Sequence, residues 1–238
     1  GEVGRDVVEK QVAELEAHGI IRKSNSAWAS RLVLVGKKTG EGVDSVRMCV
    51  DYRDLNSKLV TINSPLPRCD EAIDRLSVGA KGSFDSLFVT TLDLAAGFHT
   101  LPIREEDKKL TAFCTHRNQY EYNYLPFGIN SGPSYMVRLM DAALDGLAWD
   151  VCAPFLDDIA IFSHGTGATP EERHASSFAQ HKERLRAVLE RLTWAGLSAK
   201  ASKCHFCNTS CDYLGHHVSR KGLQMEAAKV ESIKAIDP

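Results

Sequence analysis

Two adjacent aspartates, Asp157 and Asp158, lie inside an otherwise apolar run of this 238-residue chain. The run APFLDDIAIFS (153–163) has strand-forming residues on both sides of the acids, which predicts a tight β-hairpin with the carboxylates at its tip. A solvated turn favours glycine, because glycine accepts positive φ at little cost. Two carboxylates held together repel each other unless a cation or a proton lies between them. The motif therefore indicates a site for a divalent cation.

A third carboxylate, Asp93, ends a second β-rich run, LFVTTLD (87–93), and small residues follow it. An acid at a strand end could lie beside the hairpin in one sheet. Three acids could then hold two metal ions for phosphoryl or nucleotidyl transfer, one ion activating the attacking hydroxyl and the other the leaving phosphate. The alternative is that Asp93 caps a helix and that Asp157 and Asp158 form a plain turn.

Further motifs follow one another along nearly the whole chain. They are SAWASRLVLVGKK (26–38), RMCVDYRDLN (47–56), PLPRCDEAIDRL (65–76), TLDLAAGFHTLPIREEDKKLTAF (91–113), YEYNYLPFGINSGPS (120–134), FLDDIAIFS (155–163), GLSAKASKCHF (196–206) and YLGHHVSRKGL (213–223). In this order and at this spacing, the sequence resembles the reverse transcriptase of gypsy-type LTR retrotransposons, relatives of retroviruses and plant pararetroviruses.

The resemblance implies an α+β fold, a right-hand polymerase whose antiparallel palm sheet packs on helices. Residues 1–62 and 102–131 would form the fingers, residues 63–101 and 132–222 the palm, and residues 223–238 the start of the thumb or connection. The implied activity is RNA-directed DNA polymerase activity, in which deoxynucleotides are added to a primer by two-metal nucleotidyl transfer. Asp93, Asp157 and Asp158 would be the catalytic acids and the ligands of two Mg²⁺ ions, with Mn²⁺ as a substitute.

The resemblance also implies a nucleotide site. Its residues would be Lys37, Arg47, Leu94, Ala95, Ala96 and Phe98. Lys37 and Arg47 would touch the triphosphate, for which a point charge and a planar guanidinium fork are suited. Phe98 would be the steric gate beneath the sugar, where a ring leaves no room for a 2′-hydroxyl. The alternatives are two solvated charges on a hairpin and a core aromatic at a strand-to-helix junction.

Template and primer contacts are implied for three further segments. They are Asp51, Tyr52 and Arg53, then Pro126, Phe127 and Gly128, and, at the primer grip, Leu214, Gly215 and His216. Lys203 would be the general acid that protonates pyrophosphate. The chain also departs from the family pattern. Arg31 stands where proline is usual, Gly36 where lysine is common, Ser131-Gly132 where Asn-Ala is usual, and Phe155 where tyrosine is commoner.

Hydrophobic periodicity predicts the elements that position these residues. They are a helix over 2–17, antiparallel strands at 32–35 and 47–50, a helix from 131–133 to 146, a polar loop at 164–169 and a long helix over 171–195. Glycines at 19 and 196 end the first and last of these helices.

Composition allows one or two domains with a real core, since the chain is 43% hydrophobic and 25% charged. No apolar stretch approaches membrane-spanning length, so no membrane partner is expected. The net charge of −2 hides two basic segments, because residues 22–58 carry 8 basic against 4 acidic residues and residues 181–238 carry 10 against 6. Residues 59–180 carry 9 against 16. This division suits phosphate contacts at the basic segments and metal in the acidic middle, although ordinary surface variation gives the same pattern.

The chain reads as a piece of a longer polyprotein, because Gly1 is not an initiator methionine. The expected partners are an RNA or DNA template with its primer, deoxynucleoside triphosphates, and downstream thumb and RNase H modules. The expected location is intracellular, in a cytoplasmic particle or the nucleus, and the seven cysteines indicate reduced thiols. The oligomeric state stays open.

A zinc site is the competing motif, with Cys204, Cys207, Cys211, His216 and His217 as its ligands. Zinc takes four tetrahedral ligands, commonly from two close pairs, and no finger or knuckle spacing occurs here. A half-buried hairpin with cysteines as small hydrophobes explains the pattern as well.

Three functional classes fit the sequence. They are an active RNA-directed DNA polymerase, a domesticated or decayed copy acting as a non-catalytic nucleic-acid-binding scaffold, and another palm-fold nucleotidyl transferase. The intact Asp93, Asp157 and Asp158 favour the first class, because a decayed copy usually loses at least one of these acids. Phe98 and the fingers motifs argue against the third.

Overall fold

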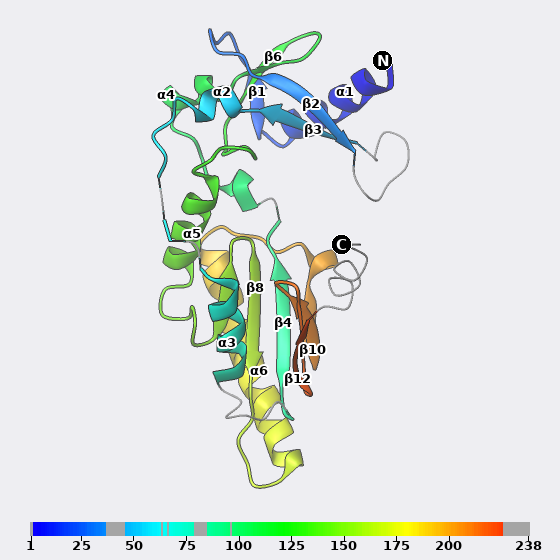
Figure 1. The fold of residues 1–238 in the computed structure, drawn as a ribbon, viewed down its shortest axis with the longest axis vertical. Helices are drawn as coiled ribbons and strands as arrows, with labels where there is room; N and C mark the ends of the chain where they lie inside the picture. The colour runs from blue at the N-terminus through cyan, green and yellow to red at the C-terminus, as the bar shows by residue number, and fades with distance from the viewer. Residues whose placement is uncertain are drawn as a thin grey trace, which may run out of the picture. The chain divides into compact units, whose positions relative to one another are not determined.

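The computed structural model describes residues 2–36, 46–62, 64–65, 67–78, 85–95 and 97–225, and the chain divides into two compact units (Figure 1). The first unit comprises residues 1–63 and 96–135, and the second comprises residues 64–95 and 136–238. This interleaved division runs close to the predicted fingers and palm boundaries, but residues 97–101 and 132–135, predicted as palm, belong to the first unit. Fingers and palm remain predicted names for the two units. Lys37, Ala96 and most of the predicted thumb segment lie outside the described residues.

The first unit is built from short helices and two small sheets. Its elements are α1 (Glu2–Ala17), β1 (Ile21–Lys23), β2 (Arg31–Gly36), β3 (Val46–Asp51), α2 (Arg53–Asn56), η2 (Gly97–Thr100), α4 (Glu105–Lys108), η3 (Lys109–Thr111), β5 (Phe113–Cys114) and β6 (Gln119–Tyr122). The strands form a β1-β6-β5 sheet and a separate antiparallel β2-β3 pair. The predicted first helix and the predicted strand pair are thus confirmed. Val8 and Val12, one helical turn apart on α1, pack into a core with Phe113, Tyr120 and Tyr122.

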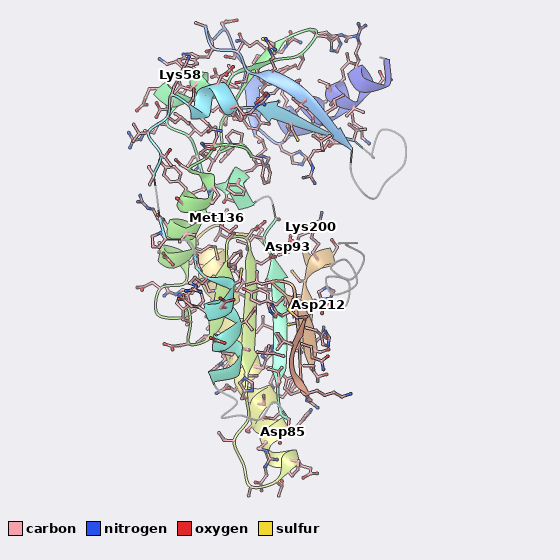
Figure 2. The ribbon with its side chains drawn as sticks, in the orientation of Figure 1. Lys58, Asp85, Asp93, Met136, Lys200 and Asp212 are labelled. Carbon is pink, nitrogen blue, oxygen red and sulfur yellow. The ribbon has the colours of Figure 1, made fainter. Side chains whose placement is uncertain are left out.

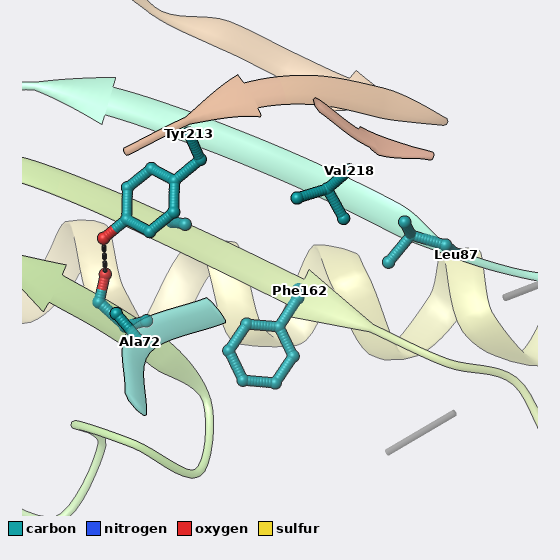
Figure 3. Packing of buried hydrophobic residues seen from close by; sticks show 7 residues of the cluster. Ala72, Leu87, Phe162, Tyr213 and Val218 are labelled. Carbon is teal, nitrogen blue, oxygen red and sulfur yellow. Dashed lines mark hydrogen bonds between the residues drawn. The ribbon is translucent and has the colours of Figure 1, made fainter. Parts of the chain in front are cut away.

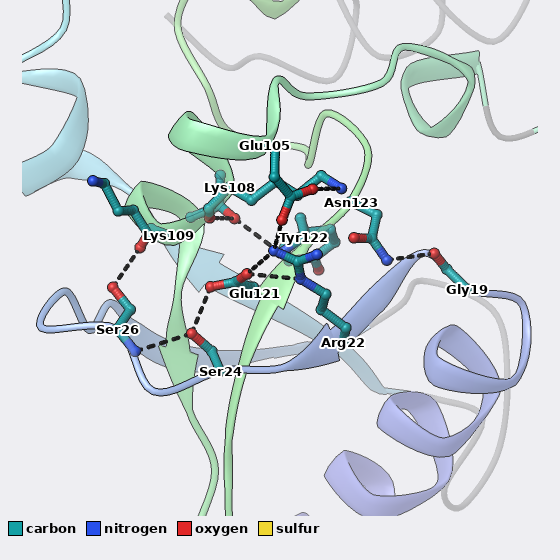
Figure 4. A network of polar contacts seen from close by, with 11 residues as sticks. Gly19, Arg22, Ser24, Ser26, Glu105, Lys108, Lys109, Glu121, Tyr122 and Asn123 are labelled. Carbon is teal, nitrogen blue, oxygen red and sulfur yellow. Dashed lines mark hydrogen bonds and ion pairs between the residues drawn. The ribbon is translucent and has the colours of Figure 1, made fainter.

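A polar network fastens β1 to β6 in this unit (Figure 4). Arg22 Nε donates to Glu121 Oε1 at 2.8 Å, and the same guanidinium pairs with Glu105 at the start of α4. Ser24 Oγ donates to the other oxygen of Glu121 at 2.6 Å. Glu121 is buried, and its two oxygens are satisfied by these donors, as a buried carboxylate requires.

The second unit centres on a four-stranded sheet in the order β7-β8-β4-β9. Its elements are α3 (Cys69–Val78), β4 (Phe88–Asp93), most of α5 (Gly132–Ala143), β7 (Cys152–Phe155), β8 (Asp158–Ser163), α6 (Pro170–Trp194), η4 (Ala201–Lys203), β9 (His205–Asn208), β10 (Ser210–Tyr213), β11 (His216–Ser219) and β12 (Gly222–Met225). The last three strands form their own antiparallel sheet. The helix predicted from 131–133 to 146 is confirmed, but it ends at Ala143.

Successive side chains of β8 point to opposite faces of the sheet, and other elements cover both faces. Ala160 and Phe162 join the cluster that includes Ala72 of α3 and Tyr213 of β10 (Figure 3). Ser163, whose side chain points to the opposite face, bonds to α6, which packs on β8 and β4. Residues 159–163 are therefore all buried, and this accounts for their continuous apolar pattern.

The long helix α6 confirms the helix predicted over 171–195, and both of its ends follow from the sequence. Thr169 and Glu172 form a capping box, with Pro170 at the first helical position. The end is marked by Gly196, whose φ of 70° is one that glycine adopts at no steric cost. Within the described part of the chain, no helix is both long enough and apolar enough to span a membrane.

Candidate active site

The acidic hairpin forms as predicted, but its turn lies one residue earlier than the acid pair. Phe155 of β7 pairs with Asp158 of β8, so the two turn residues are Leu156 and Asp157, and Asp158 is the first residue of β8. Leu156 has a φ of 55°, at the position where a type II′ turn normally carries glycine. A non-glycine residue in this region costs of order 1 kcal/mol or more, and such strain is concentrated at functional sites.

The sheet brings Asp93 beside the hairpin. Asp93, labelled in Figure 2, is the last residue of β4. Its register partner is Asp158, the first residue of β8. The amide of Leu94 donates to the carbonyl of Asp157 at 3.0 Å, which continues the pairing into the turn. The three carboxylates therefore lie at the same end of two neighbouring antiparallel strands.

Lys203 completes this cluster from a segment far away in the sequence. Its Nζ donates to Asp93 Oδ2 at 2.7 Å, and the Lys203 side chain is 55% exposed while that of Asp93 is 21% exposed. Backbone bonds hold the segment before it along the end of β4, because Ala95 N donates to Ser198 O and Lys200 N donates to Asp93 O. Sequence reasoning missed residues 198–200, since backbone contacts leave no side-chain signal.

Electrostatics couple the four charges. The pKa of the Asp158 carboxyl is raised, mainly by desolvation and then by the charges of Asp157 and Asp93, while Lys203 opposes the shift. The pKa of Lys203 is raised by its hydrogen bond to Asp93. Negative charge is thus concentrated where β4 ends and β8 begins, and such a concentration favours the binding of a cation.

The donor set fits a hard divalent cation. Mg²⁺ and Mn²⁺ prefer carboxylate oxygens, and the three aspartates supply only such oxygens. Among the residues that the structure describes, however, no three His, Cys, Asp or Glu side chains converge closely enough to hold a metal ion. The aspartates are neighbours and do not form a closed cage, and Asp93 is neutralised by the Lys203 ammonium instead.

The cysteine and histidine residues of the competing zinc motif are distributed over β9, β10, β11 and the residue before β9. His217 is engaged in a 2.7 Å contact between its Nδ1 and Asp212 Oδ1. Cys211 packs against the hydrophobic cluster that contains Tyr213, and burial raises the pKa of its thiol to about 12.

The predicted nucleotide residues fall in both units. Arg47 lies in β3 and Phe98 in η2, both in the first unit, whereas Leu94 and Ala95 follow β4 in the second. Arg47 lines a cavity of about 700 Å³ in the first unit together with His99, Phe127 and Gly128. The structure thus places Arg47 beside the second predicted template segment.

The two predicted template segments of the first unit lie together. Asn56, which follows the first of them, donates through Nδ2 to the carbonyl of Gly128 at 2.7 Å. Tyr52 is buried, and its hydroxyl donates to Thr111 O, so its side chain belongs to the core. Arg53 is exposed and forms a two-pronged pair with Asp51, which lowers the pKa of that carboxyl to about 2. A template contact by this segment stays a prediction, and among its side chains Arg53 is the exposed cation.

The predicted primer-grip residues form a tight turn in the second unit. Tyr213 pairs with His216, so Leu214 and Gly215 are the turn residues, and both have positive φ, 50° and 78°. This is the backbone of a type I′ turn. The Tyr213 hydroxyl donates to the carbonyl of Ala153 in β7 at 2.8 Å, which anchors the turn to the main sheet (Figure 3).

Comparison with known proteins identifies the family to which the chain belongs. A family model described as reverse transcriptase (RNA-dependent DNA polymerase) matches residues 35–218. The chain therefore belongs to the reverse transcriptase family.

Its relatives include polyproteins of transposons. The chain is 33% identical over 235 residues to the retrovirus-related Pol polyprotein from transposon opus of Drosophila melanogaster, covering 98% of the chain and 22% of that protein. It is 30% identical over 231 residues to the corresponding polyprotein from transposon gypsy of the same species, covering 96% of the chain and 20% of that protein. The chain thus spans about a fifth of the length of these relatives.

Solved structures share the fold. A foamy viral protease-reverse transcriptase in complex with double-stranded DNA matches with a TM-score of 0.80 and 21% identity, over 98% of this chain and 37% of that chain. The same enzyme in complex with an RNA/DNA hybrid matches with a TM-score of 0.77 and 20% identity, over 99% of this chain and 28% of that chain. The predicted α+β polymerase fold is confirmed.

Proposed function

We propose that this chain carries the polymerase site of a reverse transcriptase, which adds deoxynucleotides to a primer on an RNA or DNA template. The observation that carries the proposal is the in-register pairing of Asp93 with Asp158 next to the turn that holds Asp157. Three carboxylates at one end of two paired strands, in a chain of this family, supply the kind of ligand that two-metal nucleotidyl transfer needs.

Asp93 and Asp157 are the proposed principal ligands of two Mg²⁺ ions, and Asp158 has a supporting role. This division follows the family resemblance, and the position of Asp158 at the start of β8, directly after the turn, supports it. Bound divalent ions would activate the primer hydroxyl and stabilise the leaving phosphate. The strained turn at Leu156 supports the proposal too, since such strain is concentrated at functional sites.

Lys203 is the proposed general acid for the pyrophosphate. Its ammonium already lies within hydrogen-bonding distance of Asp93, at the acidic end of the sheet. Its raised pKa keeps it protonated, which a group that later donates a proton to a leaving phosphate requires. Its pairing partner Asp93 would hold the lysine in place between turnovers.

The nucleotide and nucleic-acid contacts are proposed from the family motifs and their placement. Arg47 would bind the triphosphate, Phe98 would exclude ribose, and Arg53 and Phe127 would meet the template strand. The foamy viral neighbours are named as complexes with double-stranded DNA and with an RNA/DNA hybrid, and these are the classes of substrate we propose here.

The test is primer extension. The purified chain is given a 5′-labelled DNA primer on an RNA template, deoxynucleoside triphosphates and Mg²⁺, and the products are resolved on a denaturing gel. The proposal expects extension that EDTA abolishes and excess Mg²⁺ restores. A non-catalytic scaffold would retain the labelled duplex in a filter-binding assay and extend it in neither condition.

A further inference from the structure

A row of aromatic rings in the first unit meets the ring of Phe98. The Phe98 and Phe127 rings lie edge to face, with centroids 5.0 Å apart. Phe127 makes a second edge-to-face contact with the imidazole of His99 at 5.5 Å, and His99 lies 6.1 Å from the buried ring of Tyr122. Phe127 is therefore held in place although the residue is 60% exposed.

The Phe98 ring also lies close to Gly132 at the start of α5. A Cβ atom at this position would lie 3.0 Å from Phe98 Cε1, which is closer than ordinary packing allows. The chain has glycine here, where the family pattern usually has alanine. Phe98 thus packs against both Gly132 and Phe127, with part of its own surface still open to solvent.

We propose that Phe127 is a positioning residue for sugar selection, because its ring holds the Phe98 ring in the orientation that excludes a 2′-hydroxyl. The inference rests on the proposed function and on Phe98 as the gate. A clash selects between sugars only if the clashing group cannot move aside, since a free ring would rotate away at little cost. Phe127, braced by His99, and Gly132 both restrict the rotation of the Phe98 ring.

The experiment measures the preference for deoxyribonucleotides over ribonucleotides, as the ratio of their kcat/KM values in single-nucleotide incorporation. An edge-to-face pair is worth enough to change such a ratio about two- to tenfold. Phe127→Leu is expected to lower the preference by this factor. Phe127→Tyr, which keeps the ring, is expected to keep the parent preference.

A matched control is Phe178→Leu. Phe178 is also an exposed phenylalanine, at 40%, with a ring partner, Phe88, at 5.3 Å, but it lies on α6 in the second unit. Its replacement should leave the preference unchanged. If Phe127→Leu acted only through a general loss of packing, both leucine variants would have a lower thermal stability and the same preference for deoxyribonucleotides.

A double-mutant cycle shows whether Phe127 acts through Phe98. In the Phe98→Val background the gate is already open, so Phe127→Leu should cause no further loss of preference. An equal loss in both backgrounds, or no loss in the parent background, would overturn the inference. If Phe127 only contacted the template, its removal would weaken incorporation of both nucleotides equally and leave their ratio intact, which also refutes the inference.

The outcomes separate this inference from the proposed function. Absence of any incorporation by the parent chain would refute the polymerase proposal, and the inference with it. Incorporation with an unchanged preference in Phe98→Val would refute the gate, and with it the positioning role of Phe127, while the polymerase proposal would stand. The positioning role alone would be refuted if the parent chain incorporates nucleotides, Phe98→Val lowers the preference for deoxyribonucleotides, and Phe127→Leu leaves this preference unchanged.

Discussion

His181 predicts a specific dependence of stability on pH. The side chain is fully buried on α6, where its Nε2 contacts Thr90 of β4 at 2.8 Å and its Nδ1 contacts Ser163 of β8 at 3.2 Å. It therefore joins the helix to the two strands that end in Asp93 and begin with Asp158. Desolvation, and to a smaller extent the charge of Arg184, lowers the pKa of this histidine to about 4.

The sign and size of the effect follow from this shift. The unfolded chain binds a proton at His181 below a pH of about 6.5, whereas the folded chain does not until about 4. The free energy of unfolding therefore falls as the pH decreases from 6.5 towards 4. Each pH unit in this window is worth about 1.4 kcal/mol, so lowering the pH from 7.5 to 5 removes about 2 kcal/mol through His181 alone.

The assay is urea denaturation of the parent and of His181→Gln at pH 7.5 and pH 5. Glutamine keeps a hydrogen-bonding side chain and removes the titration, so other groups contribute alike to both proteins. The parent should lose about 2 kcal/mol more than the variant over this change. Equal losses would show that His181 is protonated as easily in the folded chain as in the unfolded one, and would refute the reasoning.

Three further predictions concern the second unit and its ligands. Tyr213→Phe leaves the buried carbonyl of Ala153 without its 2.8 Å donor, so it should lower the free energy of unfolding, measured by urea titration, by about 1–3 kcal/mol. The control Tyr135→Phe, at an exposed tyrosine, should change this free energy little, and equal effects of the two substitutions would contradict the bond. Lys203→Gln should slow single-turnover incorporation about a hundredfold, as removal of a general acid does. Replacement of the nearby exposed Lys200 by Gln should not slow it. A rate near that of the parent for Lys203→Gln would contradict the role of Lys203 as the general acid. Affinity for template-primer should fall at least about tenfold between 50 and 200 mM salt, the loss expected from only two phosphate contacts, and salt-independent binding in fluorescence anisotropy would contradict a phosphate-based grip.

Sequence patterns predicted the local structure around the acids well. Strand-forming residues on both sides of the Asp157-Asp158 pair indicated the hairpin, and Gly196 was expected to end the long helix where the structure has its end. The position of the turn was predicted one residue too late, because Leu156 has a positive φ, which sequence patterns predict for glycine.

Contacts between distant residues were harder to predict. Lys203 and Asp93 are 110 residues apart, and only the resemblance to the family connected the lysine with the site. The buried position of Tyr52 follows from a hydroxyl bond to Thr111, 59 residues away, which no local pattern reveals. The Phe98–Phe127 contact likewise depends on how two loops fold onto each other.

Replacement of Asp157 tests the central claim most directly. Asp157→Asn removes one charge and keeps the shape of the turn, and it leaves the Lys203–Asp93 pair intact. Asp212→Asn is the control, since Asp212 is 64% exposed and paired only at the surface with His217. Incorporation of a single deoxynucleotide on an RNA template with Mg²⁺ should fall below detection in Asp157→Asn and persist in Asp212→Asn, with similar melting temperatures for both. Near-parent incorporation by a folded Asp157→Asn protein would contradict the account.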